Sequence, residues 1–221
     1  MRSCVLAALV TAGLLASPVA SAAPDGCAAL GGAVEDRGMC HVHAATPAYT
    51  MNLRFPATYS DEQAIVDYLI QTRDGFTNLA EEPGGRNLPY ELDVTSQSFR
   101  SGQTSSAVLK LFENVNSAHP TTWFKSFTYN VDKGQPVTFD TAFPPGALEK
   151  IFPLVQSQLE TETGLTGSIS AADGLNPAHY QNFAITDASV IFFFGRAELL
   201  PSYADATSVV IPRSQIPPLQ L

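Results

Sequence analysis

The stretch of this chain that most constrains its fold is the apolar run Val190-Ile191-Phe192-Phe193-Phe194 near the C-terminus. Every position of the run is apolar, so both faces of the strand that it predicts must be covered. At an exposed sheet edge, residues of such high β-propensity would invite aggregation. We therefore expect a central strand. The preceding break Thr186-Asp187-Ala188-Ser189 makes it the second strand of a β-hairpin that begins near Tyr180.

The N-terminus has the composition of a secretory signal peptide. Arg2 precedes an apolar run from Cys4 to Leu15, and the small residues Ala20-Ser21-Ala22 follow. The apolar run is shorter than the ~20 residues that span a bilayer, which favours a cleaved signal over a membrane anchor. We expect cleavage after Ala22. Residues 1–22 would then be a signal peptide, and the secreted, extracellular protein would have no membrane span; association with the cell wall stays open.

Two cysteines, Cys27 and Cys40, remain after this cleavage. In an oxidising compartment a pair of cysteines is expected to form a disulfide. We therefore predict a disulfide-linked N-terminal arm over residues 23–48. The rest of the chain, residues 49–221, is of ordinary size for a single domain.

The charge of the chain limits its partners. It has 12 Lys and Arg against 21 Asp and Glu, a net charge of −9, and loss of Arg2 makes the charge more negative. Nucleic acid and anionic lipid are poor partners for such a surface, because like charges repel. A cationic protein or peptide would be attracted to it.

Periodic patterns predict the remaining elements. Alternation of apolar and polar residues indicates strands over residues 49–59, 90–100, 107–114, 121–131, 137–139 and 207–211. Short links join the strands between 90 and 131, which is typical of an antiparallel meander. Ile65, Leu69 and Phe76 recur at helical spacing, which predicts a helix that ends near Ala80 and is capped by Ser60.

A second helix is expected between Pro145 and Thr163, interrupted by Pro153. Either the helix kinks at this proline or the main helix takes Pro153 as its first residue, and we favour the second interpretation. Its apolar face should share a core with the central strand. The fold class is therefore α+β: an antiparallel sheet with a long helix packed on it, a second helix, and the disulfide-linked arm. The predicted apolar face of this helix is formed by Leu148, Ile151, Phe152, Val155 and Leu159.

Several segments after residue 50 resemble, in sequence and in order, segments of a known protein family. They are Tyr90-Glu91-Leu92, Ala118-His119-Pro120-Thr121-Thr122, Val137-Thr138-Phe139-Asp140-Thr141, Phe152-Pro153-Leu154-Val155-Gln156, Gly174-Leu175-Asn176-Pro177, Tyr180-Gln181-Asn182-Phe183-Ala184-Ile185-Thr186, Val190-Ile191-Phe192-Phe193-Phe194 and Glu198-Leu199-Leu200-Pro201. With these segments the chain resembles the secreted immunogenic antigens of mycobacteria, which are related to the extracellular domain of the RsiV anti-sigma factors. The resemblance implies an α+β fold, export and immune recognition by the host. Its RsiV branch binds lysozyme, and ester hydrolysis has been attributed to close relatives. The family has no agreed catalytic motif to transfer.

The residues themselves offer weak candidates for ester hydrolysis. Gly-x-Ser-x-Gly, the nucleophile motif of α/β-hydrolases, does not occur in the sequence. His119 and His179 are candidate bases because both are expected on loops, and Asp140 or Asp187 could orient one of them. Serines are too common to single one out. For His119, which precedes Pro120, a turn histidine bonded to nearby backbone is the simpler interpretation.

A metal site at Cys40-His41-Val42-His43 is not expected. His41 and His43 would share one face of a strand, but two imidazoles do not complete a site and the Cys40 thiolate is used by the disulfide. We expect no cofactor. Gly84-Gly85 lacks the residues of a phosphate-binding loop.

Two further groups of residues have simpler explanations than a site. Glu91 and Asp93 alternate outward on a predicted strand, as a solvated face would. An aromatic row could line a ligand groove, but aromatic residues on a strand are more often core. This row consists of Trp123, Phe124, Phe127 and Tyr129.

The sequence therefore predicts a secreted antigen that acts as an extracellular binding module. Its expected partner is an extracellular protein, host-derived or cationic. The alternative is a weak serine carboxylesterase of the cell envelope.

Overall fold

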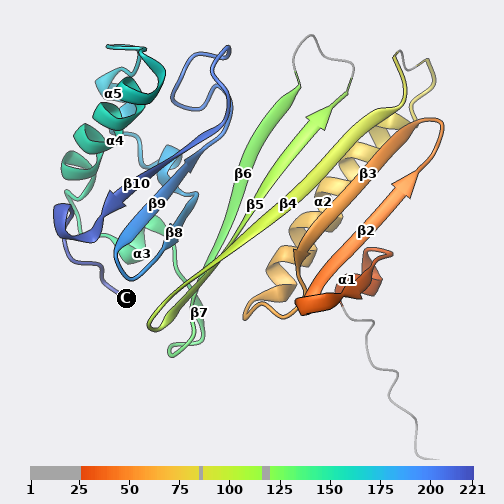
Figure 1. Ribbon diagram of the computed structural model, residues 1–221, viewed down its shortest axis with the longest axis horizontal. Helices are drawn as coiled ribbons and strands as arrows, with labels where there is room; N and C mark the ends of the chain where they lie inside the picture. The colour runs from red at the N-terminus through yellow and green to blue at the C-terminus, as the bar shows by residue number, and fades with distance from the viewer. Residues whose placement is uncertain (1–25, 85–86, 116–119) are drawn as a thin grey trace, which may run out of the picture.

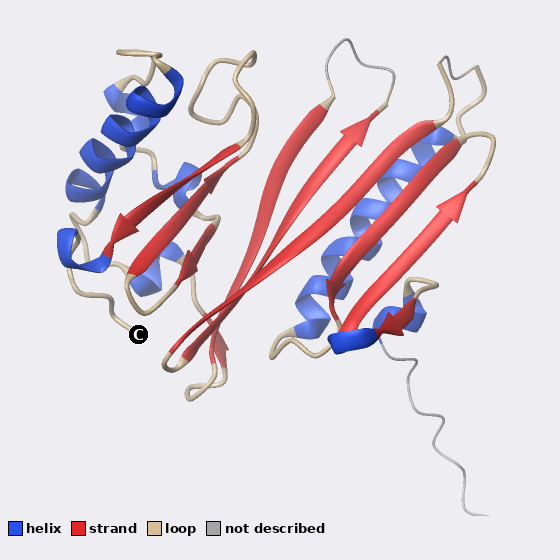
Figure 2. Ribbon diagram, in the orientation of Figure 1, coloured by secondary structure: helices blue, strands red, loops and turns tan. Residues whose placement is uncertain are grey.

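The computed structural model describes residues 26–84, 87–115 and 120–221. Two β-sheets form its framework, and the colours of Figure 2 separate them from the helices and loops. None of the helices in these ranges is long and apolar enough to cross a membrane. The predicted signal peptide at residues 1–22 lies outside the described residues.

The large sheet has seven strands in the order β1-β2-β3-β4-β5-β6-β7 (Figure 1). Neighbouring strands are antiparallel except for β3 and β4, which run parallel because helix α2 (Glu62–Ala80) connects them. The strands are β1 (Ala33–Glu35), β2 (Met39–Ala45), β3 (Tyr49–Pro56), β4 (Tyr90–Ser101), β5 (Thr104–Asn114), β6 (Thr121–Asn130) and β7 (Gln135–Pro136).

The small sheet has the order β10-β9-β8, formed by β8 (Phe183–Ile185), β9 (Ser189–Phe194) and β10 (Thr207–Pro212). The predicted hairpin is confirmed as β8 and β9, and the apolar run lies in the central strand. The remaining helices are α1 (Gly26–Ala29), α3 (Phe139–Ala142), α4 (Leu148–Thr163) and α5 (Ala171–Gly174), with 3-10 turns η1 (Asp36–Gly38), η2 (Pro177–Tyr180) and η3 (Arg213–Gln215).

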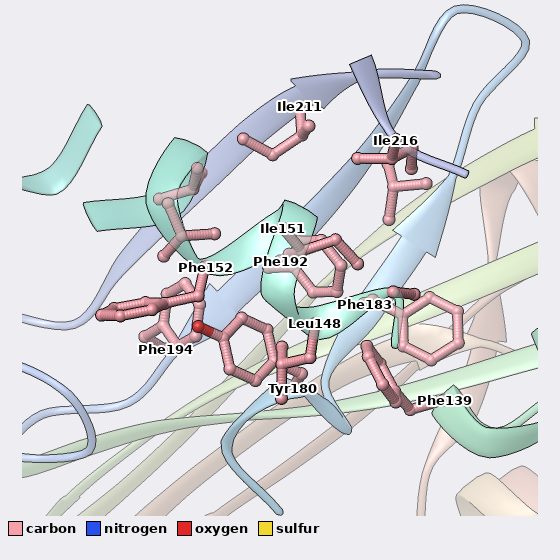
Figure 3. Close-up of a cluster of buried hydrophobic side chains, with 14 of the residues drawn as sticks. Phe139, Leu148, Ile151, Phe152, Tyr180, Phe183, Phe192, Phe194, Ile211 and Ile216 are labelled. Atoms are coloured by element: carbon pink, nitrogen blue, oxygen red, sulfur yellow. The ribbon is translucent and has the colours of Figure 1, made fainter. Parts of the chain in front are cut away.

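The two faces of β9 belong to different cores. Phe192 is fully buried in a cluster with α4 residues such as Ile151 (Figure 3), as the sequence predicted. Phe193 points the other way and packs with Val108 of β5. The next residue of β5, Leu109, belongs to the core that α2 covers. Where the sheets overlap, the layers are therefore α4, small sheet, large sheet and α2.

Polar side chains join the two sheets at the edge strand β8. The backbone N–H groups of Phe183 and Ile185 donate to the hydroxyls of Ser126 (3.0 Å) and Ser106 (3.3 Å). The Thr128 hydroxyl donates to the carbonyl of Phe183 at 3.0 Å. The large sheet thus satisfies the backbone groups that an edge strand would otherwise leave open.

The α+β class is confirmed, and three local predictions are wrong. The predicted cap at Ser60 is not used: α2 begins at Glu62, and the preceding Asp61 has neither extended backbone nor a capping hydrogen bond. The predicted strand at residues 137–139 is a helix start, since Thr138 and Thr141 form a capping box for α3.

The third correction concerns α4, which runs from Leu148 to Thr163 with Pro153 inside it rather than at its first position. The Ile151 amide already donates to the Ala147 carbonyl at 3.0 Å, so helical bonding starts before the proline. Burial of Leu148, Ile151 and Phe152 fixes this first turn on the core.

The predicted disulfide between Cys27 and Cys40 is confirmed. Both cysteines are buried, and Cys40 lies opposite Phe55 in the pairing of β2 with β3. The disulfide therefore attaches α1 to the large sheet.

Candidate functional site

The best-formed histidine–carboxylate pair at a loop end of the small sheet is His179 with Glu198. His179 belongs to η2, which begins where the Asn176 side chain accepts the Ala178 amide at 3.1 Å and Pro177 occupies the first helical turn. The next residue, Tyr180, is fully buried, and its hydroxyl donates to the Gly174 carbonyl at 2.9 Å. A buried neighbour thus fixes the position of the partly exposed imidazole.

Glu198 reaches the pair from the loop that follows β9. Its Oε1 lies 3.9 Å from His179 Nδ1, and its Oε2 accepts the Gly195 amide at 2.7 Å. The side chains of His179 and Glu198 are 23% and 22% exposed. Burial raises the pKa of Glu198, and the Gly195 N–H and His179 oppose this shift without cancelling it.

The loop that carries Glu198 is held against the start of β6. Arg196 donates through Nη1 to the Pro120 carbonyl (2.8 Å) and through Nε to the Ser202 carbonyl (2.6 Å). Gly195 lies so close to β6 that a Cβ atom would come within 3.2 Å of the Trp123 Cα. This close approach favours glycine, and the Gly195 N–H donates to Glu198.

An imidazole beside a half-buried carboxylate can accept a proton, and the carboxylate stabilises the imidazolium that forms. At 3.9 Å the contact is an ion-pair distance and longer than a hydrogen bond. Within the described ranges, no Ser or Thr hydroxyl is hydrogen-bonded to a histidine ring. The arrangement has the chemistry of a base beside a carboxylate, and no described hydroxyl is positioned as a nucleophile on the imidazole.

Neither aspartate predicted as an orienting group forms an ion pair with His179 among the described residues. Asp140 is exposed in α3, and Asp187 is exposed in the turn between β8 and β9, opposite the end where β9 runs into Gly195. Among the residues that the structure describes, His179 has Glu198 as its ionic partner and neither aspartate. His119 lies outside the described residues.

Sequence reasoning did not identify Glu198 as a site residue. The signal was its position in Glu198-Leu199-Leu200-Pro201, one of the segments that carry the family resemblance. Its spacing from His179 follows no periodic pattern, because two loops bring these residues together.

The second histidine cluster lies on the exposed face of β2 and β3. His41 Nδ1 is 2.8 Å from Glu35 Oε1, and His41 Nε2 is 2.7 Å from Asn52 Oδ1. Cys40 is in the disulfide. Over residues 26–84, 87–115 and 120–221, no three His, Cys, Asp or Glu side chains are grouped so that they could hold a metal ion.

The aromatic row of β6 divides between two cores. Trp123 Nε1 donates to the Tyr68 hydroxyl of α2 at 2.8 Å, and Lys125 Nζ lies 5.7 Å from the Tyr68 ring centroid. Phe124, on the opposite face, packs 5.2 Å from the ring of Phe193. These contacts are packing contacts with α2 and with the small sheet.

Comparison with known proteins places these features in a family. Residues 142–214, which include His179 and Glu198, match the domain described as "Protein of unknown function (DUF3298)". Two solved DUF3298 proteins share the fold. The Pseudomonas aeruginosa protein has a TM-score of 0.58 at 10% identity, covering 84% of this chain and 96% of its own. The Bacteroides fragilis protein has a TM-score of 0.54 at 14% identity, covering 83% and 92%.

Closer relatives are mycobacterial. A Mycobacterium tuberculosis protein named Esterase Rv3036c is 48% identical over 227 residues, covering 100% of both chains. The immunogenic proteins MPB64 of Mycobacterium bovis and MPT64 of Mycobacterium tuberculosis are 41% identical over 218 residues, covering 94% of this chain and 95% of each relative. With this identity across nearly its whole length, the chain belongs to the family of the mycobacterial immunogenic proteins MPT64 and MPB64.

Proposed function

We propose that this protein hydrolyses carboxylic esters, with His179 as the proton acceptor and Glu198 as its orienting group. The observation that carries the proposal is the 48% identity, over the full length of both chains, to a relative named as an esterase. The half-buried imidazole–carboxylate pair in the loops of the matched domain is consistent with it.

In this reaction His179 takes the proton of an attacking O–H group as the oxygen adds to the ester carbonyl. Glu198 stabilises the imidazolium. The bond from the carbonyl carbon to the alcohol oxygen then breaks, and His179 returns the proton to the leaving alkoxide. Where the attacking group is water, this step releases the acid. Where it is a serine hydroxyl, the acyl group stays on that serine, and His179 then takes the proton of a water molecule that attacks the acyl ester, releases the acid and frees the serine. Experiment identifies the attacking group.

The test measures hydrolysis of p-nitrophenyl acetate and butyrate by the purified protein. His179→Ala should lower kcat/KM roughly 10³-fold or more if His179 is the base, and Glu198→Gln should lower it by less. His43→Ala, on the exposed face of β2, is the matched control and should leave the rate unchanged. Circular dichroism must show that each variant is folded.

Unchanged hydrolysis by folded His179→Ala would rule out the assigned base. Loss in His119→Ala instead would move the base to that residue, and a scan of single serine-to-alanine variants would identify a serine nucleophile. Activity that survives every histidine change would be surface-promoted hydrolysis, and the esterase proposal would fail.

A second candidate is an exported antigen that binds an extracellular, cationic protein partner. It is supported by 41% identity to the two immunogenic proteins and by the net charge of −9. Export predicts that N-terminal sequencing of the secreted protein begins at Ala23 or one residue later. Extracellular protein that still begins at Met1 would contradict it.

A further inference from the structure

The outer edge of β10 carries backbone groups without a partner in the described structure. The Arg213 amide donates to the Ala188 carbonyl, so this pair is a hydrogen-bonded pair in the register of β10 with β9. In an antiparallel ladder such pairs alternate with pairs that do not bond each other. Ile211, Val209 and Thr207 therefore bond to β9, and the N–H and C=O groups of Ser208 and Val210 point outward.

The pairing of β9 with β8 agrees with this alternation of bonded and non-bonded residues. The Phe193 amide donates to the Asn182 carbonyl, and the Thr186 amide to the Ser189 carbonyl, so Ser189, Ile191 and Phe193 face β8. The intervening residues of β9 face β10. Among residues 26–84, 87–115 and 120–221, no hydrogen bond occupies the backbone groups of Ser208 or Val210.

The two edges of the small sheet thus differ. Hydroxyls of the large sheet occupy the outward groups of β8. At β10, Pro212 lacks an N–H and blunts the last position, but the edge before it carries no charged side chain. Val210 is 47% exposed. Such an edge can accept another strand.

Helix α4 lies beside β10 (Figure 1). Residues of both elements line a groove next to the β10 edge. It contains two cavities of about 370 Å³ and about 410 Å³ that share Glu162. Leu154, Val210 and Ile211 contribute apolar surface to the first, and Leu165 and Tyr203 to the second. The helical wall consists of residues three or four apart on one face of α4: Leu154, Ser157, Gln158, Thr161 and Glu162.

The charge of the groove favours a basic occupant. Glu162 and Asp205 line it, and none of the described residues that line either cavity is Lys or Arg. The Gln158 amide holds the Glu162 carboxylate at 2.8 Å. Arg213 follows β10 but contacts the Ser101 hydroxyl, at 3.4 Å. A second copy is disfavoured, because each chain carries a net charge of −9.

We propose that the β10 edge and this groove bind an extended peptide segment with alternating apolar and basic residues, which adds as a fourth strand to the small sheet. The outward groups of Ser208 and Val210 supply the backbone hydrogen bonds. The apolar residues of the groove take one set of side chains, and Glu162 and Asp205 attract the basic residues. The proposal gives a site to the binding role above, on which it rests, and it does not depend on ester hydrolysis.

The test uses the full chain and acetylated peptides of alternating Val and Lys, long enough to pair with the six residues of β10. Fluorescence anisotropy should show that the Lys peptide binds and that the matching Glu peptide does not. N-methylation of the alternate peptide amides that face β10 should weaken binding roughly tenfold or more, whereas methylation of the other set should not. Hydrogen exchange at the Ser208 and Val210 amides should slow when the Lys peptide is bound.

A pair of protein variants provides the second arm. Val210→Pro removes an outward N–H and should lower affinity roughly tenfold or more, while Val210→Thr keeps the N–H, changes only the side chain, and should lower affinity much less than Val210→Pro. If Val210→Pro does not fold, the N-methylated peptides decide the question with the wild-type chain.

Equal binding of both N-methylated peptides, or unchanged exchange at Ser208 and Val210, would overturn the proposal. So would a dimer in sedimentation whose Ser208 and Val210 amides are protected without peptide, since the edge would then belong to a second copy. A cationic protein that binds while these amides stay unprotected would leave the binding role standing and reject this site.

Discussion

At the scale of single residues, Glu113 has a half-buried carboxylate at the end of β5. This carboxylate has no hydrogen-bond or ion-pair partner among the described residues. Burial raises the pKa of Glu113 above its usual value. The folded state therefore binds this proton more tightly than the unfolded state. It follows that Glu113 makes the protein less stable as pH rises from the ordinary carboxyl pKa through the raised one.

We predict that Glu113→Gln raises the melting temperature at pH 7, because the amide removes the buried charge. The gain should shrink as pH falls through the raised pKa of Glu113 and vanish below the ordinary carboxyl pKa of about 4.3, where the carboxyl group is neutral in both states. Thermal unfolding across this pH range measures the effect. Glu82→Gln, at an exposed loop position, is the control; a Glu113 variant less stable than wild type at pH 7 would contradict the prediction.

At the scale of elements, α4 contains a proline that it does not need for its packing. Pro153 is exposed, and its missing N–H leaves the Glu149 carbonyl without its helical donor. The helix persists because its apolar face, which includes Ile151 and Val155, is buried on both sides of the proline.

Pro153→Ala should therefore stabilise the protein by about 1–3 kcal/mol, as it restores the hydrogen bond and removes the ring from the helix interior. Urea unfolding gives this free energy. Ser157→Ala, exposed one turn later, should gain no more than about 0.5 kcal/mol from helix propensity. Destabilisation by Pro153→Ala would show that the proline is needed where it stands.

At the scale of the whole molecule, the contact between the two sheets depends on Thr128. Its buried hydroxyl donates to the Phe183 carbonyl and lies 3.0 Å from the Ser106 hydroxyl, which in turn accepts the Ile185 amide. Three hydroxyls, from Ser106, Ser126 and Thr128, bond to the outward backbone groups of β8, where a neighbouring strand would otherwise pair. Loss of one of these hydroxyls should therefore cost stability.

We predict that Thr128→Val, which keeps the shape and removes the hydroxyl, costs about 1–3 kcal/mol by leaving buried backbone unsatisfied. Hydrogen exchange should accelerate at the Phe183 and Ile185 amides. Thr121→Val, exposed on the same strand, should leave both stability and exchange unchanged. Unaltered exchange in Thr128→Val would mean that apolar packing alone joins the sheets.

The sequence by itself determined the features that local pattern encodes. The full apolarity of Val190–Phe194 predicted a covered strand, and the helical spacing of Ile65, Leu69 and Phe76 predicted α2. The disulfide between Cys27 and Cys40 was also predicted and is confirmed. Local prediction erred at Ser60, at Pro153 and at residues 137–139. The backbone at Asp61 starts α2 at Glu62, and the capping box of Thr138 and Thr141 starts α3. Burial of the first turn of α4 keeps Pro153 inside that helix.

Only the tertiary structure decided that there are two sheets, that β8 is closed by hydroxyls while β10 is open, and that Glu198 rather than Asp140 or Asp187 faces His179. Each of these features joins residues whose spacing along the chain follows no repeat. Periodicity reports which side of an element is buried, and it carries no record of which distant element covers that side. The candidate site joins η2 to the loop after β9, and the open edge lies between β10 and α4. Tertiary packing brings these elements together.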